Sequence, residues 1–215
     1  MAAWKIVADQ LGKPSGMAGG IAASLWNRRN AALNETALAL LALQPTDRVL
    51  DVGFGGGYLL QRMMAVVTAG RLAGVDISPA MVAGAQRRFR QQVAAGRLDL
   101  HCATVEALPF PDGSFTRVSS VNSLFYWQDV AQGLREIKRV LVAGGVLVLC
   151  FTCRESLEGK RFARHLQLPD VEDLQSTMQA IGYRAITVRS FSDRHRMYYG
   201  LVATAEPVEE ADHGG

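Results

Sequence analysis

Short apolar runs alternate with helical stretches from residue 46 onward. Apolar runs of this length, bounded by glycine, proline or aspartate, are typical of buried strands. The expected strands are 48–52, 71–76, 98–103, 116–121 and 146–151. Between them, apolar positions recur three and four residues apart. This spacing predicts helices over 58–69, 78–96 and 129–141. The alternation predicts a parallel sheet with crossover helices.

Local signals mark where these helices begin and end. Gly70 follows the first helix and is expected to stop it. Ser78 offers a capping hydroxyl, and Pro79 suits the first position of the next helix. Gly96 is expected to end that helix.

The carboxyl-terminal part breaks the alternation. A helix is expected over 170–181, with Gly182 as its cap. The apolar stretches 183–188 and 197–205 then follow without a helix between them. Two strands joined in this way form an antiparallel hairpin, which we place at an edge of the sheet. The chain is therefore predicted to be a doubly wound α/β protein with a mostly parallel, seven-stranded sheet.

The expected core domain spans 46–205. Two segments do not follow the alternation of strands and helices. Residues 1–45 contain two predicted helices broken by glycines, and we expect them to form a helical cap. Residues 154–169 are polar and irregular. Both segments are candidates to cover the carboxyl ends of the strands. The tail, 206–215, is expected to be disordered.

The composition is typical of a globular domain and gives no sign of a nucleic-acid or membrane partner. The 215 residues suffice for one substantial core, and 49% hydrophobic with 20% charged residues is ordinary for a globular domain. A net charge of +3 favours neither a nucleic acid nor a membrane surface. Arg87, Arg88 and Arg90 cluster on a predicted helix, where a solvated face is the favoured interpretation. No apolar run is long enough to span a bilayer, and the first residues lack the layout of a signal peptide.

The three cysteines indicate a reducing compartment, so we expect a cytoplasmic protein. Cys150 and Cys153 have the CxxC spacing, but they end an apolar strand instead of opening a helix. We interpret them as packing residues rather than as a redox or zinc pair. Since no second pair of cysteines or histidines has ligand spacing, no metal is expected.

A glycine loop, 51–57, follows the first strand with the sequence Asp-Val-Gly-Phe-Gly-Gly-Gly. In an open α/β sheet, the carboxyl ends of the strands form the crevice where ligands bind, and residues without Cβ let the backbone approach a ligand closely. A dinucleotide fingerprint needs a small residue where this chain has Tyr58 or Leu60, depending on the starting glycine. The Gly-Lys-Ser/Thr ending of a nucleotide triphosphate loop is also missing. The loop matches instead the pattern acid-x-Gly-x-Gly-x-Gly, with Asp51 followed by Gly53, Gly55 and Gly57.

Three segments carry a resemblance to a known family. They are 49–57, 106–115 (Glu-Ala-Leu-Pro-Phe-Pro-Asp-Gly-Ser-Phe), and 134–141 followed by Gly144-Gly145. In this order they resemble the class I S-adenosylmethionine-dependent methyltransferases, especially the small type 11 branch related to quinone-biosynthesis methyltransferases. The resemblance covers about 46–205. It implies a Rossmann-like methyltransferase fold with S-adenosyl-L-methionine as cofactor and S-adenosyl-L-homocysteine as product.

The resemblance also implies which residues bind the cofactor. Asp76 is expected to accept hydrogen bonds from the ribose hydroxyls, although it could instead cap the helix that starts near Ser78. Ile77 is expected against the adenine face, and Asn122 near the methionyl end, where a turn role is nearly as favoured. The implied cofactor-binding set is Asp51, Gly53, Phe54, Gly55, Gly57, Asp76, Ile77, Thr104, Val105 and Asn122.

The chain departs from the family pattern at several positions. Thr104 stands where relatives often have an acid near the adenine amino group, so that contact is in doubt. Thr116 replaces a common acid, and Val142-Ala143 replaces the frequent Lys-Pro. The aromatic trio 125–127 occupies a stretch where many relatives carry histidines.

The aromatic trio is also the candidate acceptor site. Tyr126 and Trp127 follow the fourth strand and are expected to contact a small-molecule methyl acceptor, with packing on the next helix as the alternative. In the amino-terminal segment, Trp26, Asn27 and Asn30 are weaker candidates to fold over the cofactor.

A sulfonium methyl is already activated, so transfer needs alignment and exclusion of water more than a dedicated base. His101 lies in a strand and is interpreted as structural. His165 and His195 could approach an acceptor, but no catalytic base is assigned. The alternatives are a nicotinamide-dependent oxidoreductase and a non-catalytic cofactor-binding regulatory domain. The acceptor, the methylated atom and the oligomeric state stay open.

Overall fold

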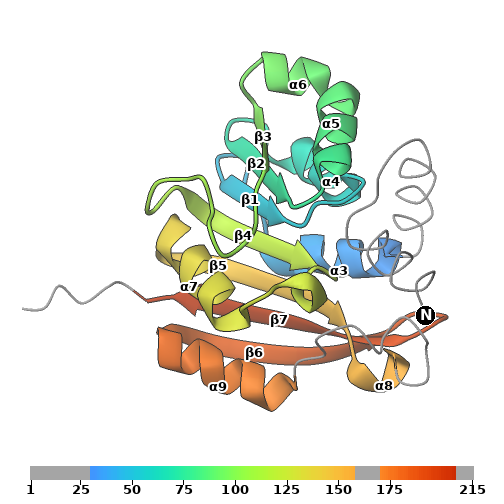
Figure 1. The fold of residues 1–215 in the computed structure, drawn as a ribbon, viewed down its shortest axis with the longest axis vertical. Helices are drawn as coiled ribbons and strands as arrows, with labels where there is room; N and C mark the ends of the chain where they lie inside the picture. The colour runs from blue at the N-terminus through green and yellow to red at the C-terminus, as the bar shows by residue number, and fades with distance from the viewer. Residues whose placement is uncertain (1–29, 158–169, 207–215) are drawn as a thin grey trace, which may run out of the picture.

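The computed structural model describes residues 30–157 and 170–206. At its centre is a seven-stranded sheet with the order β3-β2-β1-β4-β5-β7-β6 (Figure 1). The strands are β1 (Arg48–Val52), β2 (Arg71–Asp76), β3 (Leu98–Cys102), β4 (Phe115–Val121), β5 (Leu141–Thr152), β6 (Tyr183–Ser192) and β7 (Met197–Ala205). The helices are α3 (Ala31–Leu41), α4 (Tyr58–Val66), α5 (Pro79–Arg88), α6 (Arg90–Ala94), η1 (Leu124–Tyr126), α7 (Val130–Val140), α8 (Arg154–Leu157) and α9 (Val171–Ile181).

The sheet is parallel from β1 to β5, and the last two strands form the predicted antiparallel hairpin. β7 pairs with β5 on one side and β6 on the other, antiparallel to both. β6 is therefore the edge strand, and it runs in the same direction as β5. As a result, the β6–β7 turn lies at the same end of the sheet as the carboxyl ends of β4 and β5 (Figure 1). The predicted doubly wound, mostly parallel fold is confirmed.

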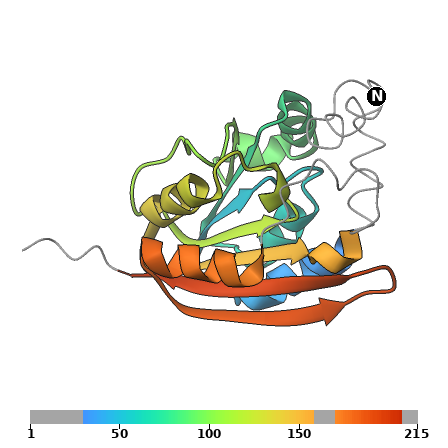
Figure 2. The same ribbon diagram turned by 60° about the horizontal axis from the view of Figure 1, so that its bottom comes forward.

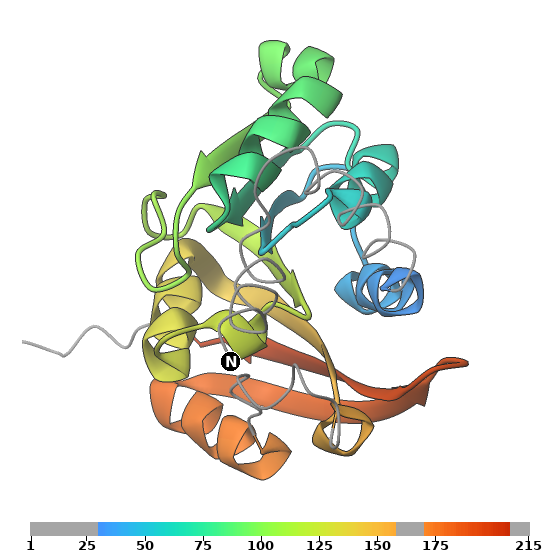
Figure 3. The ribbon, with the colours of Figure 1, turned by 45° about the vertical axis from the view of Figure 1, so that its right-hand side comes forward.

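Helices cover both faces of the sheet and create two apolar cores. α3, α4 and α5 lie on one face, where Leu33, Leu60 and Met81 belong to one core cluster (Figure 3). α7 and α9 lie on the other face, where Ile137 and Met178 belong to the second (Figure 2). Two covered faces explain why the central strands read as continuous apolar runs rather than alternating ones.

The predicted helix caps are confirmed where they depend on local sequence. Ser78 has an extended backbone and its hydroxyl accepts a hydrogen bond from the Met81 N–H at 3.4 Å, with Pro79 at the first helical position. Gly182 ends α9 in the left-handed region, with φ +94°. Glycine adopts this conformation without the steric penalty of a Cβ, so the chain turns directly into β6.

Several predicted boundaries are wrong, and contacts between distant segments account for some of them. α4 ends at Val66 rather than 69, and Gly70 is not its cap: a Cβ at Gly70 would lie 1.9 Å from the carbonyl oxygen of Asp47. The helix predicted over 78–96 breaks at the buried Phe89 into α5 and α6. β5 begins at Leu141, before the double glycine, because this residue pairs with Phe115.

The amino-terminal cap is described only from residue 30 onward. α3 packs on the face of the sheet beside α4, and the side-chain hydroxyl of Thr36 hydrogen-bonds the Tyr198 hydroxyl of β7 at 3.0 Å. Residues 1–29, 158–169 and 207–215 lie outside the described residues, as do Trp26, Asn27 and His165. In the described ranges, no helix combines the length and apolar character needed to cross a membrane.

Candidate functional site

The glycine loop leaves the carboxyl end of β1 with a left-handed backbone at three positions. Gly53, Gly55 and Gly57 have φ angles of +75°, +52° and +72°. The loop is fixed to the neighbouring strand, because the Gly53 N–H donates to the carbonyl of Val75 at 2.8 Å. Residues other than glycine and asparagine rarely adopt this left-handed backbone conformation, so the path of the backbone itself requires the glycines.

The space around the three glycines differs. A Cβ at Gly53 would lie 2.4 Å from the Cβ of Ser123, and one at Gly57 would lie 2.7 Å from the ring of Phe89. At Gly55, no atom of the described residues lies within 4 Å of the Cβ position. Gly53 and Gly57 are therefore required by internal packing, whereas the loop at Gly55 faces open space that a ligand can enter.

Asp76 at the end of β2 holds this loop. One carboxylate oxygen accepts the Gly55 N–H at 2.8 Å, and the other accepts the Ser78 N–H at 2.8 Å. Burial raises the pKa of Asp76, and these two backbone hydrogen bonds oppose that shift. Since a carboxylate has about four acceptor positions, the group retains capacity for a ligand hydroxyl. The helix-cap alternative is only partly realised, because the cap of α5 is the Ser78 hydroxyl.

A second acid, Asp51, lies beneath the loop. Its side chain is 2% exposed, and it accepts a hydrogen bond from the Ser119 hydroxyl at 2.8 Å. Burial, and the negative charge of Asp76, raise the pKa of Asp51 to about 7, although the Ser119 hydrogen bond acts in the opposite direction. A positive charge nearby, such as that of a cationic ligand, would favour the ionised form of Asp51.

The other predicted cofactor residues line the same end of the sheet in different ways. Ile77 and Thr104 are half-buried, after β2 and β3 respectively. Val105 is a core residue facing α7, and Phe54 is also buried, its ring against Gly74 of β2. Phe54 and Val105 can therefore border a ligand only through their backbone or the edge of the side chain.

Asn122 follows β4 with a left-handed backbone, φ +53°. Its N–H donates to the carbonyl of Cys150 at 2.8 Å, and its Oδ1 accepts the Thr152 N–H at 2.9 Å. The residue thus combines a turn conformation with a position between the carboxyl ends of β4 and β5.

The two predicted acceptor residues take different places. Trp127 is 5% exposed, and its Nε1–H donates to the Ser123 hydroxyl at 3.1 Å. Its ring lies 3.0 Å from the position of a Cβ at Gly133 of α7, which corresponds to the alternative of packing on the next helix. Tyr126 is half-buried, and burial raises its pKa. Of the pair, Tyr126 has the more accessible surface.

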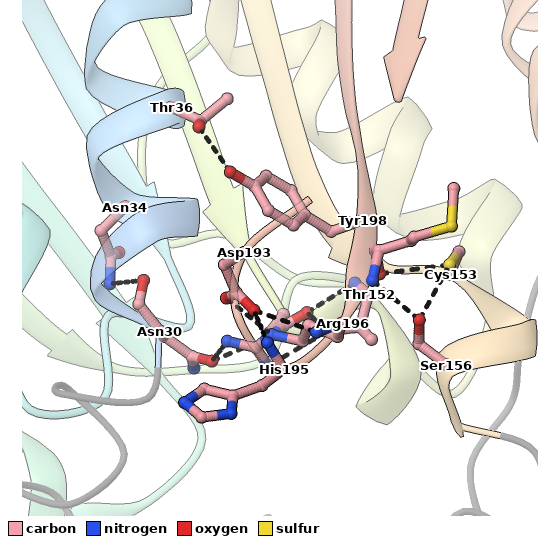
Figure 4. Close-up of polar contacts among 12 residues, drawn as sticks. Asn30, Asn34, Thr36, Thr152, Cys153, Ser156, Asp193, His195, Arg196 and Tyr198 are labelled. Atoms are coloured by element: carbon pink, nitrogen blue, oxygen red, sulfur yellow. Dashed lines mark hydrogen bonds and ion pairs between the residues drawn. The ribbon is translucent and has the colours of Figure 1, made fainter. Parts of the chain in front are cut away.

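Sequence reasoning missed Ser123 and Arg196. The Ser123 hydroxyl donates to the carbonyl of Val52 at 3.2 Å, and its Cβ lies against Gly53. Arg196 comes from the β6–β7 turn and reaches Thr152 and Asn30 (Figure 4). No motif marks either residue, because both act through contacts with segments far away in the chain.

Among the described residues, the histidines and the two buried cysteines contribute little to this site. His101 lies on β3 with its Nε2 2.8 Å from the Asp99 carboxylate, and His195 is exposed in the β6–β7 turn. Cys150 and Cys153 are buried free thiols. Burial raises the pKa of Cys150 to about 12, so this thiol is protonated at neutral pH.

Comparison with known proteins decides the family. A family model described as a methyltransferase domain matches residues 50–149. The chain is 32% identical over 136 residues to the uncharacterized methyltransferase YdaC of Bacillus subtilis, covering 63% of this chain and 73% of that protein. The chain belongs to the S-adenosylmethionine-dependent methyltransferase family. The predicted resemblance is thereby confirmed.

Other relatives place the methyltransferase within that family. The ubiquinone/menaquinone biosynthesis C-methyltransferase UbiE of Geotalea uraniireducens is 36% identical over 103 residues, covering 47% of this chain and 44% of that protein. The chain spans about half the length of several such curated relatives. A methyltransferase structure from Aquifex aeolicus superposes with a TM-score of 0.69 and 18% identity, covering 93% of this chain and 97% of that one, which shows the fold alone. None of these relatives supports the oxidoreductase alternative.

Proposed function

We propose that this methyltransferase transfers the methyl group of S-adenosyl-L-methionine to a small organic acceptor by in-line displacement, releasing S-adenosyl-L-homocysteine. The observation that carries the proposal is the loop at Gly55. Its backbone N–H is bound to Asp76, while the space on its Cβ side is open. A backbone cradle next to an anchored carboxylate fits a ligand with a ribose, and the bulky Tyr58 stands where a loop that binds a dinucleotide pyrophosphate needs a small residue.

The residues around the loop suit the parts of this donor. The remaining acceptor positions of Asp76 would receive the ribose hydroxyls. Ile77 and Thr104 would border the adenine, and Asn122 would lie near the methionyl end. Asp76 is held next to the loop by two backbone N–H groups, and the negative charge of its carboxylate favours a sulfonium over a neutral sulfur.

The bound donor supplies a methyl group activated by its positive sulfur. The protein's own contribution is alignment of the acceptor and exclusion of water. Tyr126, after β4, is the proposed acceptor contact. The neighbouring Trp127 is fixed by the hydrogen bond from its Nε1–H to the Ser123 hydroxyl. No side chain is assigned as a general base, because an acceptor that arrives ionised or is a soft nucleophile needs none.

A small acceptor also fits the relatives. One of them is a 2-methyl-6-phytyl-1,4-hydroquinone methyltransferase of Oryza sativa, whose name gives a hydroquinone as the acceptor. We further propose a cytoplasmic location, supported by three free cysteines, and no nucleic-acid partner, supported by the small net charge.

Calorimetric titration followed by a transfer assay tests the proposal. S-adenosyl-L-methionine should bind, and NAD⁺ should not. With methyl-labelled donor and a panel of hydroquinones, phenols, amines and thiols, at least one acceptor should become labelled. Binding of NAD⁺ without binding of the donor would overturn the proposal. Donor binding without transfer to any compound of a broad panel would favour the regulatory alternative.

A further inference from the structure

Four side chains from four distant segments close a ring of hydrogen bonds at the carboxyl ends of β4 and β5. Figure 4 shows three of them, Asn30, Thr152 and Arg196. Arg196 in the β6–β7 turn donates to the Oδ1 of Asn30 at 2.9 Å, and Asn122 donates to the same oxygen at 3.0 Å. The Thr152 hydroxyl donates to the Oδ1 of Asn122 at 3.2 Å and accepts from Arg196 at 3.3 Å. The ring joins the start of α3, the ends of β4 and β5, and the β6–β7 turn.

The guanidinium in this ring is already neutralised. The Arg196 side chain is 8% exposed, and its Nε lies 3.5 Å from the Asp193 carboxylate. Burial acts to raise the pKa of Asp193, but the N–H groups of His195 and Arg196 and the Arg196 charge outweigh it and hold that pKa below its usual value. A charge already paired with a carboxylate is suited to fixing geometry rather than to attracting an anion.

The ring holds the side chain of a residue in a left-handed turn. The φ of Asn122 is +53°, a conformation that asparagine adopts more readily than other residues with a Cβ, and the ring fixes the direction of its amide. The next residue, Ser123, bonds the carbonyl of Val52 and contacts Gly53. The conformation of Asn122 therefore sets where Ser123 meets the glycine loop.

We propose that Arg196 is a positioning residue for methyl transfer, which acts through Asn30 and Thr152 to hold Asn122 and, through Ser123, the donor loop. This rests on the proposed function. Arg196 is not a catalytic residue, since it acts only through its neighbours. Its loss would leave the loop sampling geometries in which the donor binds less well.

The test uses a charge-balanced variant, Arg196→Met with Asp193→Asn, so that no buried charge is left unpaired. The matched control is Arg184→Met with Glu206→Gln, which removes an ion pair of 2.8 Å next to the opposite end of the same hairpin. S-adenosyl-L-homocysteine is the probe, titrated by calorimetry at a temperature where circular dichroism shows every variant folded. The ring variant should bind it about 3- to 30-fold more weakly, and the control should match the wild type.

A double-mutant cycle separates positioning from general loosening of the fold. Asn122→Gly removes the amide but adopts the left-handed backbone freely. If Arg196 acts through Asn122, the combined variant should bind no more weakly than the weaker of the two, so the losses are not additive. Additive losses, or unchanged affinity in the ring variant, would overturn the proposal while leaving the proposed function standing. No binding to the wild-type protein would instead overturn the proposed function.

Discussion

The substitution Gly55→Ala tests whether Gly55 is a glycine because a ligand approaches it, rather than because the fold requires it. Within residues 30–157 and 170–206, its Cβ would meet nothing within 4 Å, so the new methyl displaces no atom of this part of the protein. The substitution carries only the strain of a side chain at φ +52°. Gly113→Ala is a matched control, because Gly113 also has a positive φ, +62°, and open space, but it lies before β4 at the opposite end of the sheet.

The expected magnitudes differ for folding and for binding. Both substitutions should lower the free energy of unfolding by about 1–2 kcal/mol, the cost of a left-handed residue with a Cβ. For a chain of this size, each kcal/mol corresponds to about 2–4 °C in Tm. Only at Gly55 would the methyl overlap a bound donor, and such an overlap costs about 1–3 kcal/mol, which corresponds to a roughly 5- to 150-fold increase in Kd.

The assay combines calorimetric titration of S-adenosyl-L-homocysteine with thermal unfolding. We expect similar Tm losses for the two variants and a large loss of affinity for Gly55→Ala alone. Equal affinities for the two variants would refute the reasoning, because the donor would then not approach the loop at Gly55.

Three further predictions concern the acids Asp76 and Asp51 and the aromatic residue Tyr126. Asp76→Asn should weaken S-adenosyl-L-homocysteine binding by about 1–3 kcal/mol in calorimetry, and Asp99→Asn on the exposed surface should not; equal affinities would remove Asp76 from the site. Asp51 has a folded-state pKa of about 7, above its unfolded value, so the native protein binds the extra proton and stability should fall as pH rises from about 4 to 7. Asp51→Asn should flatten that slope in urea unfolding, and a slope that persists contradicts the assignment. Tyr126→Ala should raise the KM for the acceptor while leaving the donor Kd unchanged; a weakened donor Kd would place Tyr126 elsewhere.

The parts of the fold that follow local sequence rules were predictable. Ser78 and Pro79 start α5 because a capping hydroxyl and a fixed φ act within one turn. The glycine pattern after β1 marks the loop because backbone conformation depends on the residue itself. These signals need no knowledge of the rest of the chain.

Features created by contacts between distant segments were not predictable. Gly70 is a glycine because the backbone of Asp47 leaves no room for a Cβ, and nothing near residue 70 indicates this. The sequence could not decide whether Trp127 contacts an acceptor or packs internally. In the structure its indole N–H donates a hydrogen bond to the buried Ser123. Arg196 reaches the site only because β7 returns antiparallel beside β5.

A crystal structure with bound S-adenosyl-L-homocysteine tests the central claim most directly. The ribose hydroxyl oxygens should lie about 2.5–3.0 Å from the Asp76 carboxylate, with the ligand passing within van der Waals distance of Gly55. A ligand bound elsewhere, or a ribose that does not contact Asp76, would contradict the claim that this loop and this carboxylate hold the methyl donor.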